Sequence, residues 1–404
     1  MVQKNKKELD IHSYETSYKG IVARLERSEI SINNKNLIKN FDDLCCLEKL
    51  SIPRRMKIIH TLTLFAENYL KKEYDKASVE NYKEAILKIE KNSEYSVWTK
   101  QAYSLIVRKF VSWLKYGDRY KLVVEKQRYP PEVDYIRAHI KPKDKPKVMA
   151  SELLTEEDLD KILSRCDNIR DKAFISLLYE LGGRISEIGN LKISHCKRDE
   201  YSYVIDLEGK TGHRTPRAIS SDPFLTAWIN SHPLRDDLNS PLWVSYNSNE
   251  HLHYNSLRSI VLRLVEKAGI KKRVYQHLFR HSRVTHLLMN KQVNEAQAKV
   301  YFGWLPASKM LSEYSHLVSE DVNDILLQVN GVKKNIEKEV FKCPRCTRNN
   351  QKSSLFCSFC SSPMNTKVAI ELDAKRGESD EQLVDLLKIP EVRKAIMNAV
   401  KQSK

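Results

Sequence analysis

The sequence has no apolar run long enough to cross a lipid bilayer, which takes about 20 consecutive apolar residues. It also lacks the apolar stretch of a secretory signal, because the chain opens with the charged segment MVQKNKKELD. No internal repeat is evident. We therefore expect a cytoplasmic protein without a membrane partner, built from two or three non-repeating domains.

Acidic residues are too few to balance the basic ones. Asp and Glu number 52 against 69 Lys and Arg, which leaves a formal net charge of +17. Such a charge attracts a polyanion through long-range steering and counterion release, so nucleic acid is the expected partner. The charge alone fits a merely basic globular protein equally well. A function must therefore come from particular residues.

The first part of the chain shows no convincing alternating strand pattern. From about Ser13 to Gly117 the apolar residues recur at helical spacing, as in MKIIHTLTLFAENYL, which predicts an all-helical domain over residues 1–127. The next segment, residues 128–150, holds prolines among lysines and arginines, namely Pro130, Pro131, Pro142 and Pro146. This composition predicts an extended basic linker that could lie along phosphates.

A second domain is expected over residues 151–332. Thr155 followed by Asp158 is a capping-box pattern at the start of a helix. Helical spacing is interrupted once, where YSYVIDL and RTPRAIS flank the turn EGKTGH, and this pattern is typical of a hairpin with Lys210 at its tip. The predicted fold class is mainly α with a small β-hairpin or sheet.

The cysteines do not form a disulfide-like framework. Four are scattered and are expected to be small buried residues: Cys45, Cys46, Cys166 and Cys196. The other four form two CxxC pairs separated by ten residues: Cys343, Cys346, Cys357 and Cys360. Four thiolates at this spacing predict one structural Zn²⁺ in a small ribbon over residues 340–366. This segment has too few apolar residues to fold alone, so zinc would supply its folding energy.

The last segment, residues 367–404, is predicted to contain an amphipathic helix. Its apolar residues follow helical spacing, with Pro390 suited to a first turn: Ile389, Val392, Ile396 and Val400. Such a helix would pack its apolar face on another surface.

Basic and ring-bearing residues concentrate in two segments of the second domain, GGRISE at residues 182–187 and QHLFRH at residues 276–281. Neither is specific alone, because an arginine after a glycine pair is more often a helix-start residue and a helical histidine is usually structural. Their order along the chain, together with three further positions, is the specific signal.

From about Thr155 to Asn330 the sequence resembles the tyrosine recombinase, or phage integrase, family. By this resemblance Arg184 is the first catalytic arginine and Lys210 the hairpin lysine. His277 and Arg280 form the HxxR box. Trp304 occupies the His/Trp position and Tyr314 that of the nucleophile. Trp304 stands where the family more often has histidine. An ordered set of six positions is far more specific than any one of them.

These residue types suit attack by a tyrosine on a phosphodiester. The attack adds negative charge to an anionic phosphate, and Arg184 and Arg280 can donate planar forks to its non-bridging oxygens. The phenol of Tyr314 has an ordinary pKa of about 10, so it needs a base, for which His277 is the candidate. Lys210 would protonate the departing 5′ oxygen.

Other residues would support this chemistry. Trp304 would donate its indole N–H to the phosphate. Glu187 lies close to one helical turn after Arg184 and could orient its guanidinium, whereas His281 could assist or simply pack. The scheme requires no catalytic metal, nucleotide or small-molecule substrate, and four cysteines would leave zinc no open coordination position.

The resemblance also implies partners. It implies that the helical first domain binds double-stranded DNA, and that four protomers act on two DNA sites through a 3′-phosphotyrosyl intermediate and a Holliday junction. A type IB topoisomerase is the alternative enzyme, and the compact spacing from the HxxR box to Tyr314 disfavours it. A non-catalytic DNA-binding regulator is disfavoured because all six positions are filled. Gly209-Lys210-Thr211 is no P-loop, since Val204 replaces the first glycine of that motif.

Overall fold

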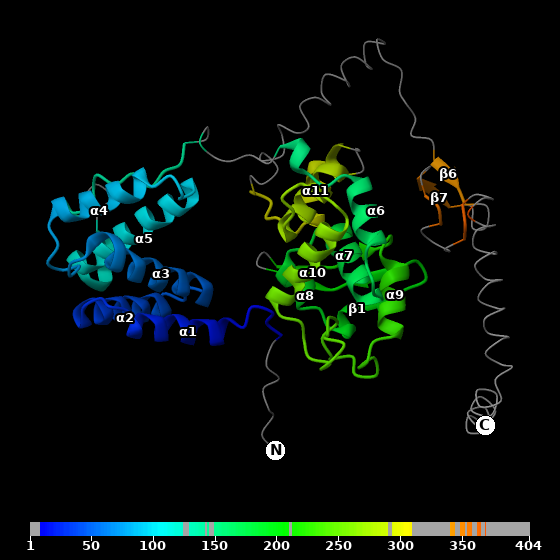
Figure 1. Ribbon diagram of the computed structural model, residues 1–404, viewed down its shortest axis with the longest axis horizontal. Helices are drawn as coiled ribbons and strands as arrows, with labels where there is room; N and C mark the ends of the chain where they lie inside the picture. The colour runs from blue at the N-terminus through cyan, green and yellow to red at the C-terminus, as the bar shows by residue number, and fades with distance from the viewer. Residues whose placement is uncertain are drawn as a thin grey trace, which may run out of the picture. The chain divides into compact units, whose positions relative to one another are not determined.

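The computed structural model describes residues 9–123, 129–141, 144, 149–209, 212–289, 293–308, 340–343, 348–351, 354–357, 362–364 and 368. The chain divides into two compact units, residues 1–148 and 149–404, each described here by itself (Figure 1). Over these described residues no helix is long and apolar enough to cross a membrane.

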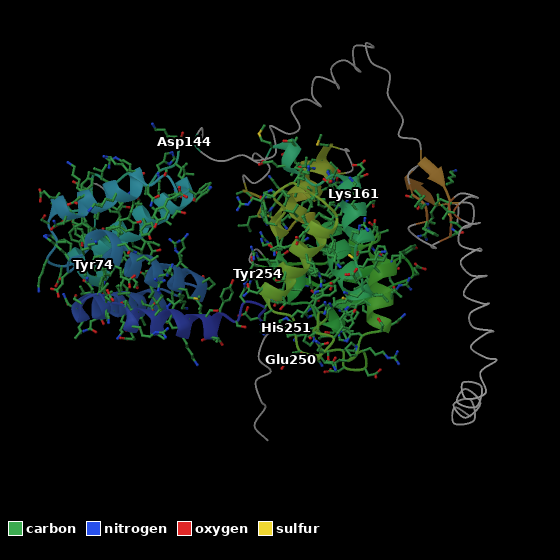
Figure 2. All side chains as sticks on the ribbon, in the orientation of Figure 1. Tyr74, Asp144, Lys161, Glu250, His251 and Tyr254 are labelled. Carbon is green, nitrogen blue, oxygen red and sulfur yellow. The ribbon has the colours of Figure 1, made fainter. Side chains whose placement is uncertain are left out.

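The first unit is helical, as predicted. Its helices are α1 (Tyr14–Arg27), α2 (Ile32–Leu47), α3 (Ile52–Phe65) with a π-helical continuation (Ala66–Leu70), α4 (Val79–Lys91), α5 (Val97–Tyr116) and a 3₁₀ turn (Gly117–Leu122). Serine side chains cap α2, α4 and α5 by accepting a backbone N–H of the first turn. Tyr74, labelled in Figure 2, lies in the core and donates its hydroxyl to the carbonyl of Leu62 at 2.6 Å.

Residues 129–136, which the sequence analysis assigned to a linker, belong to the core of this unit. Val133 and Ile136 are 0% and 3% exposed and join the same apolar cluster as the helices. Successive turns bring both side chains inward, because Val133 N–H bonds to the carbonyl of Pro130 and Ile136 N–H to that of Val133. The proline-rich composition therefore marks a packed turn here and not an extended chain.

The second unit is also mainly helical. Its helices are α6 (Glu156–Ser164), α7 (Ile169–Glu180), α8 (Ile185–Gly189), α9 (Asp222–Asn230), α10 (Tyr254–Lys267), α11 (Gln276–Met289) and α12 (Glu295–Tyr301), with 3₁₀ turns at Ala150–Glu152 and Ile193–His195. Helix α7 is the central one: it is buried on nearly all sides and packs on α9 and α11 (Figure 1). The predicted capping box at Thr155 is present, since Thr155 and Asp158 exchange side-chain to backbone hydrogen bonds at 3.1 Å.

Two small antiparallel sheets interrupt these helices. Strands β1 (Cys196–Arg198), β2 (Tyr203–Ile205) and β5 (Arg217–Ala218) form one sheet in the order β1-β2-β5, and β3 (Leu207–Gly209) pairs with β4 (Gly212–Arg214) in the other. The predicted hairpin is thus present as two successive ladders, because the pairing changes at Asp206, whose N–H bonds to the carbonyl of His195. Lys210 and Thr211 lie between β3 and β4, outside the described residues.

The described residues near the carboxyl end form a small pair of strands, β6 (Val340–Lys342) and β7 (Asn349–Gln351), and an antiparallel bridge between Phe356 and Pro363. Tyr314 and all but one residue of the predicted terminal segment lie outside the described residues. The predicted boundaries at 332, 340 and 366 remain predictions.

Candidate active site

Two glycine turns set the backbone of the site. After α7, Gly182 adopts a left-handed conformation with φ of 50°, and its N–H bonds to the carbonyl of Tyr179 at 3.0 Å. After α12, Gly303 does the same with φ of 63°, and the following N–H of Trp304 bonds back to the carbonyl of Lys299 at 2.8 Å. Both are helix ends that favour glycine. Arg184 follows the first turn in the chain, and Trp304 follows the second.

Arg280 on α11 joins these two turns. Its Nη1 donates to the carbonyl of Gly182 at 2.7 Å and its Nη2 to the carbonyl of Phe302 at 2.8 Å. The side chain is almost fully buried, and its guanidinium carbon lies 5.3 Å from the ring centroid of Trp304. A guanidinium stacked on an aromatic ring and bound by two carbonyls has a fixed orientation. The HxxR arginine therefore lies between Trp304 and the turn that precedes Arg184.

Arg184 caps the start of α8 and is held by Glu187. The Glu187 carboxylate accepts the Arg184 N–H at 3.0 Å and the Arg184 Nη1 at 2.5 Å, as the helical spacing predicts. The same carboxylate accepts Nη2 of Arg214 at 2.9 Å. Burial acts to raise the pKa of Glu187, but the charge of Arg214 and the hydrogen bonds from both arginines outweigh it and leave that pKa below its ordinary value.

His277 and His281 lie one helical turn apart on α11. Their ring centroids are 4.6 Å apart and the rings are nearly perpendicular. Partial burial, followed by positive charge on His281, Arg280 and Arg184, lowers the pKa of His277 to about 4. Burial and Arg280 also lower the pKa of His281. Near neutral pH the His277 imidazole is therefore uncharged and able to accept a proton.

Of the six predicted catalytic positions, the structure describes four, and it brings Arg184, His277, Arg280 and Trp304 together around the two turns. Lys210 and Tyr314 lie outside the described residues. Arg214 was not among the predicted site residues, although it binds Glu187 from strand β4. Its place in the ladder was a usable signal, because Arg214 pairs with the buried Leu207 and so lies on the inward face.

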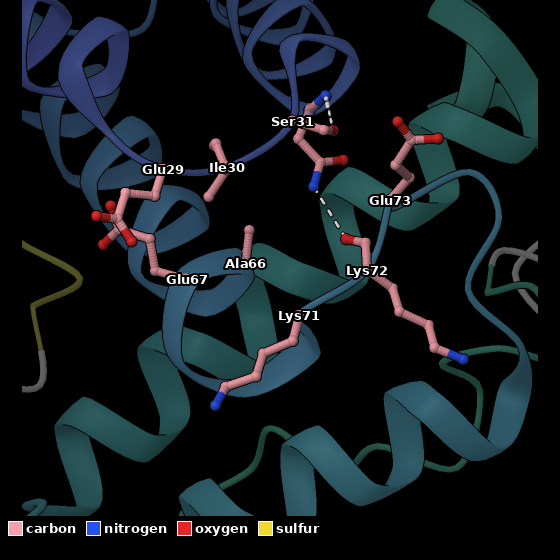
Figure 3. Close-up of a pocket in the computed structure, with 9 residues that line it drawn as sticks. Glu29, Ile30, Ser31, Ala66, Glu67, Lys71, Lys72 and Glu73 are labelled. Atoms are coloured by element: carbon pink, nitrogen blue, oxygen red, sulfur yellow. Dashed lines mark hydrogen bonds between the residues drawn. The ribbon is translucent and has the colours of Figure 1, made fainter.

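A separate pocket of about 420 Å³ lies within the first unit, where α2 begins and the π-helical segment ends (Figure 3). Its lining mixes acidic side chains such as Glu29 and Glu67 with Lys71 and Lys72. The side-chain amide of Asn34 bonds to the carbonyl of Lys72 at 2.9 Å and closes one wall. None of the predicted site residues lines this pocket, so it is no part of the candidate active site.

The described part of the cysteine segment brings two of the four predicted zinc ligands together. Cys343 and Cys357, the first cysteine of each CxxC pair, are 1% and 2% exposed and form one buried cluster with Met364. Each donates its N–H to a carbonyl five residues later in the chain: Cys343 N–H bonds to the carbonyl of Arg348, and Cys357 N–H to that of Ser362. Cys346 and Cys360 lie outside the described residues, and among those described no group of three metal ligands occurs.

Residues 152–320 match the Phage integrase family. Tyrosine recombinase XerA of Pyrococcus horikoshii is 36% identical over 138 residues, which are 33% of this chain and 47% of that protein. A tyrosine recombinase of Thermosipho africanus is 29% identical over 178 residues, 43% of this chain and 60% of its own length. The chain thus spans about half the length of the curated relatives it matches.

Solved structures show the same fold. A lambda integrase fragment bound to DNA superposes with a TM-score of 0.51 at 13% identity, over 68% of this chain and 92% of that one. The XerH recombinase in a post-cleavage complex with a palindromic difH substrate gives a TM-score of 0.50 at 16% identity, over 80% and 98%. With the family match and the mainly helical architecture, these likenesses confirm the predicted fold class. Residues 152–320 form a domain of the phage integrase family, the tyrosine recombinases.

Proposed function

We propose that this protein is a site-specific DNA recombinase that cleaves and rejoins DNA through a 3′-phosphotyrosyl bond to Tyr314. The observation that carries the proposal is the arrangement of an uncharged His277 beside the guanidinium groups of Arg184 and Arg280, with Trp304 stacked on the second. This combination offers donors for a phosphate and an acceptor for a phenolic proton.

The proposed reaction conserves the number of phosphoester bonds. The Tyr314 oxygen attacks phosphorus as its proton passes to His277, the bond to the 5′ oxygen breaks, and Lys210 donates a proton to that oxygen. Arg184 and Arg280 stabilise the charge on the non-bridging oxygens without a metal. The reverse reaction with a 5′ hydroxyl of another strand rejoins the DNA.

Double-stranded DNA is the proposed substrate and partner. The net charge of +17 favours a polyanion, and the lambda integrase and XerH structures that share the fold are described as bound to DNA. We propose that the first unit contributes to DNA binding and that four protomers assemble on two sites. Exchange of strands between two DNA partners would distinguish this function from topoisomerase-type relaxation.

Tyr301 is the nearest rival nucleophile, and its surroundings do not suit that role. Its hydroxyl donates to the carbonyl of Glu180 at 2.9 Å. Burial raises the pKa of this phenol, which disfavours the phenolate needed for attack. Tyr301 therefore serves to join α12 to the end of α7.

The test is to incubate the purified protein with fragmented genomic DNA from its source organism and to sequence the DNA that stays bound after denaturation. The wild type should give adducts at defined sites, and Tyr314→Phe should bind the same DNA without forming them. Tyr301→Phe is the matched control and should keep the adduct. A denaturant-resistant adduct in Tyr314→Phe would exclude Tyr314 as the nucleophile.

We also propose that Cys343, Cys346, Cys357 and Cys360 hold one structural Zn²⁺. The proposal is supported by Cys343 and Cys357, which lie in one buried cluster and have matching backbone hydrogen bonds, because thiolates from two CxxC pairs can complete a tetrahedron. The metal would stabilise the small strand pair and take no part in cleavage. Metal analysis should find one zinc per chain, and replacing Cys343 and Cys346 with serine should abolish it while cleavage persists. Absence of zinc from the wild-type protein would refute the proposed zinc site.

A further inference from the structure

Both strands of the β3–β4 hairpin lie against one buried carboxylate, and β4 is bonded to it. On β3, a Cβ added to Gly209 would lie 2.4 Å from Oε1 of Glu187, so the strand backbone lies directly against this carboxylate. On β4, Nη2 of Arg214 binds Oε2 of Glu187 at 2.9 Å. Glu187 is the residue that also holds Arg184. The hairpin and the first site arginine therefore share an anchor.

Arg214 has a second partner. Its Nη1 donates to the carbonyl of Tyr301 at 2.5 Å, at the end of α12 and three residues before Trp304. Only 8% of the Arg214 side chain is exposed. One planar guanidinium thus links the hairpin to α8 and to the turn that precedes Trp304. Lysine cannot reproduce this geometry, because it presents a single ammonium group.

The hairpin depends on such anchors. A two-stranded ladder of three residues a strand has little stability of its own. The Glu187 carboxylate is buried, so removing Arg214 would leave it with a single charged partner and free β4 to move. The residue that immediately follows Gly209 in the chain is Lys210.

We propose that Arg214 is a positioning residue. It holds the β3–β4 hairpin in place relative to Arg184 and thereby positions Lys210. Arg214 acts through Glu187 and the Tyr301 carbonyl and touches no reacting atom. This inference rests on the proposed function, in which Lys210 protonates the departing 5′ oxygen.

The test compares two versions of the duplex found by adduct mapping, one ordinary and one with sulfur in place of the bridging 5′ oxygen at the cleaved phosphate. A thiolate departs without needing an acid. Arg214→Gln should form the adduct roughly 100-fold more slowly on ordinary DNA, the scale of a lost general acid, and recover on the sulfur duplex as Lys210→Ala does. Binding of the duplex should change by less than about twofold, because Arg214 is buried.

Arg217→Gln is the matched control. It removes the same charge from the next strand in the chain, β5, where Arg217 is 44% exposed and pairs with Asp199 at 2.6 Å. It should cleave both duplexes at the wild-type rate. Arg214→Lys keeps the charge but loses the planar fork of donors, and it should show the same selective recovery. This second variant keeps the inference testable where Arg214→Gln fails to fold.

A readout on the DNA-free protein separates the inference from the proposed function. Amide hydrogen exchange in peptides that cover β3 and β4 should accelerate in Arg214→Gln and stay unchanged in Arg217→Gln. Unchanged exchange would overturn the inference whatever the protein's activity. Equal cleavage defects on both duplexes would also overturn it, since Arg214 would then act through the phosphate-binding arginines. A wild type that forms no adduct on either duplex would refute the proposed function instead.

Discussion

Replacing Gly182 with alanine tests the packing of the site most directly, because the new methyl group would meet the ring of Phe302. The added Cβ would lie 2.5 Å from Cε1 and 3.2 Å from Cδ1 of that ring. Phe302 is fully buried, lies 5.3 Å from the Trp304 ring and has the Arg280 guanidinium over it at 5.2 Å, so it has little room to turn.

Two costs add in this variant. Alanine in the left-handed conformation costs about 1 kcal/mol, and overpacking against the ring costs about 1–3 kcal/mol more. Gly269→Ala separates them. Gly269 also has a left-handed φ of 67°, at the end of α10, but its added Cβ would meet nothing within 4 Å. It should lose only about 1 kcal/mol.

The measurement is native-state hydrogen exchange in increasing urea, read on peptides from α7, which reports the free energy of unfolding within the second unit. We expect Gly182→Ala to exceed Gly269→Ala by about 1–3 kcal/mol. Adduct formation should also slow, because the Gly182 carbonyl accepts Nη1 of Arg280. Equal losses of stability in the two variants would show that the Phe302 ring yields freely, and the argument from packing would fail.

Three further predictions follow from the described residues. Because the pKa of His277 is lowered to about 4, adduct formation should show no loss near pH 6.5 and should fall only as the pH approaches 4. The stability that this histidine contributes should be complete above pH 6.5 and should decline below it. A His277-dependent inflection in single-turnover rates near pH 6.5 would contradict both expectations. Thr155→Ala should cost about 1 kcal/mol in urea unfolding, since it removes the cap of α6, and no loss would show that the cap is idle. Val133→Ala should destabilise the first unit by about 2 kcal/mol, whereas replacing the exposed Lys141 with alanine should not. Equal free energies of unfolding for the two variants would show that residues 129–136 are a linker after all.

Features with a local cause were predictable from the sequence. The capping box at Thr155 and Asp158 depends on residues three apart, and the helices of the first unit on a period that the apolar residues display. The packing of Val133 and Ile136 was not predictable, because it depends on helices far away in the chain. Strands of two or three residues are also too short to display a period, which is why β1 was missed and one hairpin proved to be two ladders.

The same distinction holds for the site. Glu187 was predicted because it lies one helical turn after Arg184, so its contact is local. Arg214 approaches the same carboxylate from 27 residues away in sequence, and only the register of β3 with β4 brings it there. An arginine opposite a buried leucine needs a polar partner nearby, but the sequence does not say which residue supplies it.

The buried carboxylate also explains how two arginines can lie close together. Arg184 and Arg214 would repel each other across so short a distance if Glu187 did not bind both. Arg280 is held by the carbonyls of Gly182 and Phe302. Three guanidinium groups and one carboxylate leave an excess of positive charge beside an uncharged His277. In the proposed reaction this excess would stabilise a phosphodiester whose negative charge grows during attack, and so would favour the transition state over the ground state.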